Sequence, residues 1–114
     1  MVEANVDYWL KASQEKFDTA QKLFALEKFS DALFFLHLSI EKLLKAIYLK
    51  KKNEAAPFIH DLVRLAEGTG LDIDEETKSQ LVEISTFNIA GRYDDYKYNF
   101  YKKATGEYTK TWMK

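Results

Sequence analysis

The stretch "DALFFLHLSIEKLLKAIYLKKK", residues 31–52, decides the fold of this chain. It is apolar nearly all round through Leu38, which is typical of a helix with neighbours on several sides. Later it becomes amphipathic, and it ends in three lysines that suit the negative end of a helix dipole. We therefore predict a central helix over residues 30–52 with Ser30 as its N-cap. Its predicted core positions are Leu33, Leu36, Ile40, Leu44 and Ile47.

A second long helix is predicted before it. Apolar residues recur at three- and four-residue steps over residues 5–27, and charged residues fill the other face. A short break separates the two segments, so we expect them to form an antiparallel hairpin.

Shorter helices are predicted after Pro57, which cannot continue a helix interior. Asp61 suits an N-cap and Gly68 a helix stop. Asp72 with Glu75 three residues later resembles a capping box. Leu81, Ile84 and Phe87 continue a helical stripe, and a last helix is expected from Thr105.

These elements predict an all-α fold: a four- to five-helix up-and-down bundle with a long N-terminal helical hairpin. We expect a single domain over residues 1–114, with a last helix that is short or truncated.

The amino-acid composition excludes several kinds of functional site. The absence of cysteine excludes disulfides and thiolate metal sites and fits a reducing compartment. Two histidines are too few for a histidine metal cage, and no glycine-rich phosphate loop is present. We expect neither a metal nor a cofactor, no membrane contact because no apolar run approaches the length of a span, and a cytoplasmic location.

His37 and Glu41 lie four residues apart and so face the same way on the central helix. They form either an acid/base or metal pair, or a buried polar pair that fixes helix packing. The apolar residues around His37 favour the structural polar pair. His60, which precedes a short helix, is also expected to be structural.

The stretch "FNIAGRYDDYKYNFYKK", residues 87–103, carries the candidate ligand contacts. The formal charge of residues 91–114 is +3, against −4 for the rest of the chain, which is compatible with a polyanion contact. The arginine can bind a phosphate bidentately, or it can pair with a carboxylate and hold this segment against the bundle. The candidate set is Arg92, Tyr93, Asp94, Tyr96 and Lys97.

Three blocks of this sequence, "DALFFLHLSIEKLLKAIYL", "PFIHDLVRLAEGTGL" and "FNIAGRYDDYK", together resemble the HEPN domain (higher eukaryotes and prokaryotes nucleotide-binding). The match is to small prokaryotic members with an RYPDY segment, although the family's proline is missing here. The resemblance implies a helical bundle, a homodimer with Arg92 at a groove near the two-fold axis, and a nucleotidyltransferase partner in a toxin–antitoxin-like pair. It also implies a nucleotide or RNA ligand.

Many members of the family that this chain resembles are metal-independent ribonucleases. Those members carry an arginine followed four to six residues later by a histidine. Here Tyr96, Lys97 and Tyr98 occupy those places after Arg92. We therefore expect a non-catalytic nucleotide- or nucleic-acid-associated module. The alternatives are a divergent ribonuclease that uses Arg92, and a homo-oligomeric helical scaffold.

Overall fold

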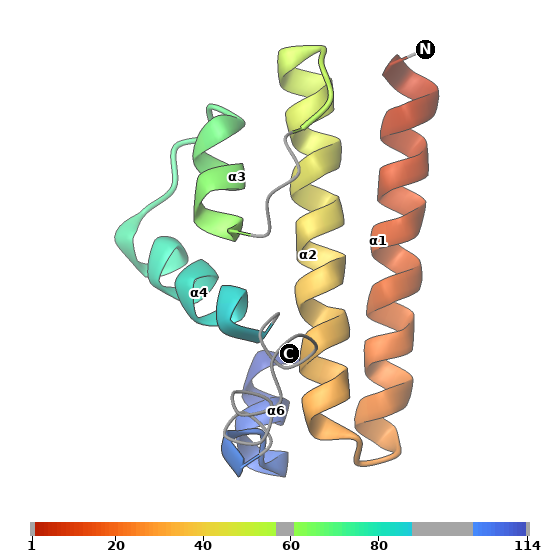
Figure 1. Ribbon diagram of the computed structural model, residues 1–114, viewed down its shortest axis with the longest axis vertical. Helices are drawn as coiled ribbons and strands as arrows, with labels where there is room; N and C mark the ends of the chain where they lie inside the picture. Colours follow the sequence, from red (N-terminus) through yellow and green to blue (C-terminus); the bar gives the residue numbers. More distant parts are fainter. Residues whose placement is uncertain (1, 57–60, 88–101, 114) are drawn as a thin grey trace.

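The computed structural model describes residues 2–56, 61–87 and 102–113, and these form an all-helical bundle. The helices are α1 (Val2–Ala25), α2 (Phe29–Lys52), α3 (Leu62–Gly68), α4 (Glu75–Ser85) and α6 (Gly106–Trp112). Figure 1 shows α2 in the middle, with α1 on one side and the three short helices on the other. The predicted fold class and the long N-terminal hairpin are therefore confirmed. None of the described helices combines the length and apolar character needed to cross a bilayer.

The contact between α1 and α2 is built from small side chains spaced seven residues apart. On a helix, residues seven apart lie nearly on one line, two turns from each other. All five are buried: Ser13, Ala20, Ala32, Ser39 and Ala46. We call this set the small-residue seam. Short side chains along a shared line let two helix backbones approach closely.

Two serines cross the seam and bond to the opposite backbone. The Ser13 hydroxyl donates to the carbonyl oxygen of Ser39 at 2.7 Å, and the Ser39 hydroxyl donates to the carbonyl oxygen of Ser13 at 2.9 Å. The two Oγ atoms are 3.2 Å apart. Each carbonyl oxygen has two lone pairs, so it accepts this bond beside the one from its own helix. Both polar groups are thus satisfied inside the helix contact.

The turn between α1 and α2 corrects the predicted N-cap. The N-cap residue of α2 is Lys28, whose side chain makes no capping hydrogen bond, and Ser30 already lies inside α2. Glu27 takes a left-handed backbone conformation with φ 61°, and the Lys28 amide donates to the Leu23 carbonyl at 2.8 Å. This tight backbone turn starts the helix earlier than a side-chain cap at Ser30 would.

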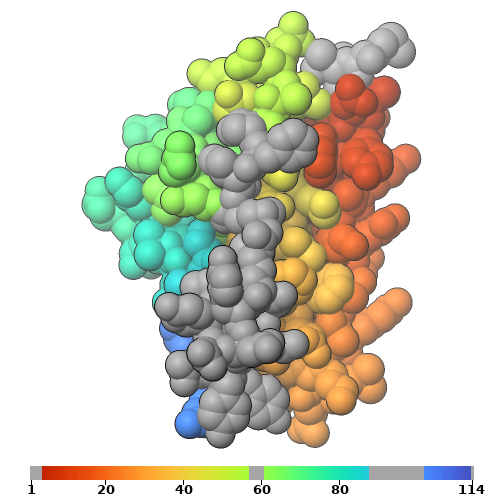
Figure 2. Space-filling view, in the orientation of Figure 1, coloured from red at the N-terminus to blue at the C-terminus, as the bar shows by residue number. Residues whose placement is uncertain are grey.

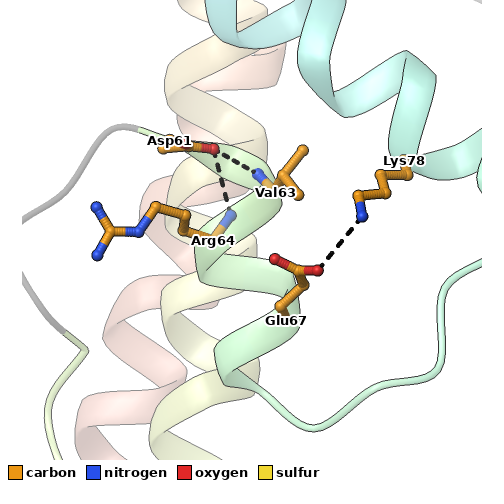
Figure 3. A network of polar contacts seen from close by, with 5 residues as sticks. All are labelled: Asp61, Val63, Arg64, Glu67 and Lys78. Carbon is orange, nitrogen blue, oxygen red and sulfur yellow. Dashed lines mark hydrogen bonds and ion pairs between the residues drawn. The ribbon is translucent and has the colours of Figure 1, made fainter.

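The short helices start at aspartate caps, and one of these also differs from the prediction. Asp61 caps α3 as expected, since it accepts hydrogen bonds from the amides of Val63 and Arg64 at 3.1 and 3.2 Å (Figure 3). The cap of α4 is Asp74, not Asp72, and it accepts from the Thr77 amide at 2.7 Å. An aspartate does cap α4, as predicted, but the capping residue is two positions further along the chain.

A salt bridge to α4 and a close glycine contact with α2 hold α3 in place. Lys78 of α4 lies 3.6 Å from a carboxylate oxygen of Glu67 on α3 (Figure 3). A methyl group on Gly68 would stand 3.0 Å from the ring of Tyr48 on α2, so a bare backbone at this point lets α3 lie against α2.

The core lies mainly on the side of α2 that the short helices cover, and Phe17 of α1 packs against it. Leu33, Leu36 and Leu44 are buried in it, whereas Ile40 and Ile47 are partly buried. The short helices and the segments beside them contribute the remaining buried residues: Leu62, Leu65, Ala66, Leu81, Ile84, Phe87 and Ala104. The ring of Phe87 meets those of Tyr108 and Trp112 edge-on, with centroids 6.2 and 5.7 Å apart. These aromatic contacts attach α6 to the end of α4.

Leu36→Ala is expected to lower the free energy of unfolding by about 2–5 kcal/mol, because Leu36 is 5% exposed and the change leaves a cavity. Leu43 on the same helix is 40% exposed, so Leu43→Ala, the matched control, should cost about 1 kcal/mol or less. Urea denaturation of both variants measures the difference. Equal losses would show that the core lies on a different face of α2.

Candidate functional site

The five residues predicted to contact a ligand lie outside the described residues. They belong to the segment 88–101, as do the remaining tyrosines of that stretch, Tyr98 and Tyr101. His60 also falls outside the described ranges. The predicted groove at Arg92 and its place at a dimer interface therefore stay predictions. Phe87, at the edge of the segment, was predicted to continue the apolar stripe of Leu81 and Ile84, and it is fully buried.

His37 and Glu41 lie in the described part of α2, and both are buried. The exposed fraction is 0% for His37 and 3% for Glu41. One helical turn separates them, so they share the side of α2 that faces away from the small-residue seam. An enclosed imidazole has no open path to a substrate in solvent, which favours the predicted structural role.

Lys45 extends this polar line by a further turn. Its ammonium group lies 3.6 Å from a Glu41 carboxylate oxygen, and its side chain is 11% exposed. The low exposure of this ion pair was not predicted from the sequence. A buried ion pair adds little net stability, yet the loss of one partner is expensive because the other charge stays desolvated.

Lysines and aromatic rings alternate across the α1/α2 contact. The Lys42 ammonium of α2 lies over the Trp9 ring of α1, 5.2 Å from its centroid, and that of Lys45 lies 5.5 Å from the same centroid. In the opposite direction, the Lys16 ammonium of α1 lies 5.6 Å from the ring centroid of Phe35 on α2. We call these five residues the lysine–aromatic patch.

The patch is reciprocal about the serine pair. Trp9 and Lys16 are seven residues apart on α1, and Phe35 and Lys42 are seven apart on α2. Because the helices are antiparallel, the ring of each helix meets a lysine of the other. This patch was not predicted from the sequence. The matching seven-residue spacings of aromatic and lysine were the available signal.

The patch concentrates positive charge. Burial lowers the pKa of Lys42, the charge of Glu41 acts in the opposite direction, and the nearby charges of Lys45 and Lys16 lower the pKa further. The result is a pKa below the ordinary value for lysine. Three ammonium groups around two rings can attract an anion, and the rings can accept a flat ligand group.

A second polar cluster joins α4 to α6. The Tyr108 hydroxyl donates a hydrogen bond to the Glu83 carboxylate, and the Lys103 ammonium lies 2.5 Å from the same carboxylate oxygen. Burial alone would raise the pKa of Glu83, but hydrogen bonds from Lys103 and Tyr108 outweigh it and lower the pKa. Burial and the bond to Glu83 raise the pKa of Tyr108 well above its usual value. This cluster anchors α6.

A cleft of about 520 Å³ lies beside the start of α2, between the α1–α2 turn and the segment that leads into α6. Its charged lining residues are Glu27, Lys28, Asp31 and Lys102. The two acidic and two basic groups give it no preference for the sign of a ligand. Within the described ranges, no group of three His, Asp or Glu side chains lies together as a metal site requires.

A long antiparallel helix pair covered by short helices makes this protein an all-α bundle, and the central helix carries buried polar residues. The family model of the HEPN domain matches residues 6–114, nearly the whole chain, and the chain therefore belongs to the HEPN family. No curated protein and no solved structure gave a match. Family membership supports a nucleotide- or RNA-associated module.

Lys45→Met is expected to lower the free energy of unfolding by about 3 kcal/mol, because it removes the lysine beside the buried Glu41 carboxylate. The double variant Glu41→Met/Lys45→Met removes both charges and should be more stable than Lys45→Met alone. Guanidinium denaturation of the three proteins at neutral pH gives the comparison. A double variant less stable than the single one would show that the pair is not the relevant unit.

Proposed function

We propose that this HEPN protein is a non-catalytic module that associates with a nucleotide or nucleic acid. It acts as a homodimer with a nucleotidyltransferase partner in a toxin–antitoxin-like pair of the RYPDY-type branch. The observation that carries the proposal is a HEPN match over residues 6–114 in a chain without the ribonuclease histidine.

Two facts support the absence of catalysis. Tyr96, Lys97 and Tyr98 stand where the ribonuclease motif needs its histidine. Tyrosine and lysine have ordinary pKa values near ~10, so neither is a matched proton acceptor at neutral pH. The histidine that the structure describes, His37, is fully buried in α2.

Binding without cleavage is the expected result when purified protein is incubated with total RNA, with Arg92→Ala beside the wild type. The wild type should leave the RNA intact and should shift the anisotropy of a labelled oligonucleotide, because binding requires no proton transfer. Arg92→Ala should bind more weakly, since a guanidinium contact to phosphate is lost.

Cleavage by the wild type that disappears in Arg92→Ala would contradict the proposal and establish the divergent ribonuclease instead. An Arg92→Ala variant with a lower melting temperature and unchanged affinity would favour the scaffold. Co-purification of the tagged protein from its native host tests the partner, and recovery of no nucleotidyltransferase would refute that part.

A further inference from the structure

The lysine–aromatic patch has more positive charge than its described surroundings neutralise. Lys45 pairs with Glu41 at 3.6 Å. Lys16 and Lys42 form no ion pair with a carboxylate in the described part of the chain, and their ammonium groups lie over the rings of Phe35 and Trp9. A ring compensates a lysine charge only partly, because a cation–π contact is weaker than a desolvated ion pair.

The patch remains open to solvent. Trp9, Lys16, Phe35 and Lys42 are all partly exposed, so an incoming ligand can reach both the ammonium groups and the rings. The small-residue seam fixes the two helices below it, so the positions of these groups are set before any ligand arrives. Preorganised groups lose less conformational entropy on binding than flexible ones.

Phosphate is the ligand group that fits best. Lysine ammonium groups bind phosphate oxygens as point charges, and each lysine that neutralises a phosphate releases counterions from the nucleic acid. Trp9 and Phe35 alternate with the lysines, and rings interleaved with positive charge are typical of single-strand binding, where bases stack on the rings. A carboxylate-rich peptide would use the lysines but would have no use for the rings.

We propose that Lys16 and Lys42, together with the rings of Trp9 and Phe35, bind the phosphate backbone and bases of single-stranded RNA. This inference rests on the proposed nucleic-acid association and names a surface for it on α1 and α2. It is a different surface from the segment that contains Arg92. An anion there also offsets the mutual repulsion of Lys16, Lys42 and Lys45.

The test compares two double variants of equal net charge. Lys16→Gln/Lys42→Gln removes two charges from the patch, and Lys11→Gln/Lys22→Gln removes two from exposed positions of α1 that form no ion pair in the described part of the chain. Fluorescence anisotropy with a labelled single-stranded RNA, repeated over a range of salt concentrations, gives the affinity and its salt slope.

The patch variant should bind on the order of tenfold more weakly at low salt, and its slope of log K against log salt should fall by about 1.4, about 0.7 for each lost contact. The control should resemble the wild type. Lys16→Arg/Lys42→Arg, which keeps both charges, should retain binding. Thermal melting followed by circular dichroism should show all variants folded.

Trp9 provides a second readout that does not depend on the lysine variants. The chain has two tryptophans, so in Trp112→Phe the fluorescence comes from Trp9 alone. Bound RNA should quench this emission, because a base stacks on the ring. Absence of quenching while the RNA is bound would overturn the role of the ring.

The outcomes separate this inference from the function on which it rests. If the wild type binds RNA and the two glutamine variants weaken equally or not at all, the patch assignment is wrong and the proposed function stands. If the wild type binds no RNA, the proposed association fails and the patch with it. Polyglutamate that competes as well as RNA would replace the assignment with an acidic protein partner.

Discussion

The reciprocal bonds between Ser13 and Ser39 are the constraint on which the rest of the structure depends. Each hydroxyl reaches the main-chain carbonyl of the opposite helix at under 3 Å, which is possible only where both backbones come close. Ala20, Ala32 and Ala46 keep the approach close along the rest of the contact. A serine pair at the centre also fixes the register, since a shift of either helix would leave two buried hydroxyls unsatisfied.

Once this register is set, each side of α2 acquires its own role. The side toward α1 carries the α2 residues of the small-residue seam. The opposite side buries the polar line that contains His37 and Glu41 and holds the short helices, and the core is built there (Figure 1). Beside the seam, Lys42 and Lys45 meet Trp9 across the helix pair. Figure 2 shows α1 and α2 side by side along the length of the molecule. Packing and charge distribution thus follow from one helix contact.

The sequence predicted the helices well because their signals are local. The apolar pattern of residues 31–52, the cap at Asp61 and the stripe through Leu81, Ile84 and Phe87 all depend on neighbours within a few residues. Ser30 and Asp72 failed as caps because a backbone turn and a competing aspartate decide the start of a helix, and propensity alone does not rank them. The low exposure of Lys45 and the lysine–aromatic patch both depend on how two helices face each other. That arrangement is set by the small-residue seam, whose seven-residue spacing is present in the sequence but does not by itself say which helix it contacts.

A double-mutant cycle across the seam tests this account most directly. The variants are Ser13→Ala, Ser39→Ala and the double change, and the measurement is the free energy of unfolding by urea denaturation. Each hydroxyl bonds to a main-chain carbonyl that the alanine variants keep, so each single variant should lose about 1 kcal/mol. The double variant should lose about the sum, apart from a coupling through the Oγ contact at 3.2 Å. Single and double variants as stable as the wild type would contradict the claim that the serine pair sets the register of the fold.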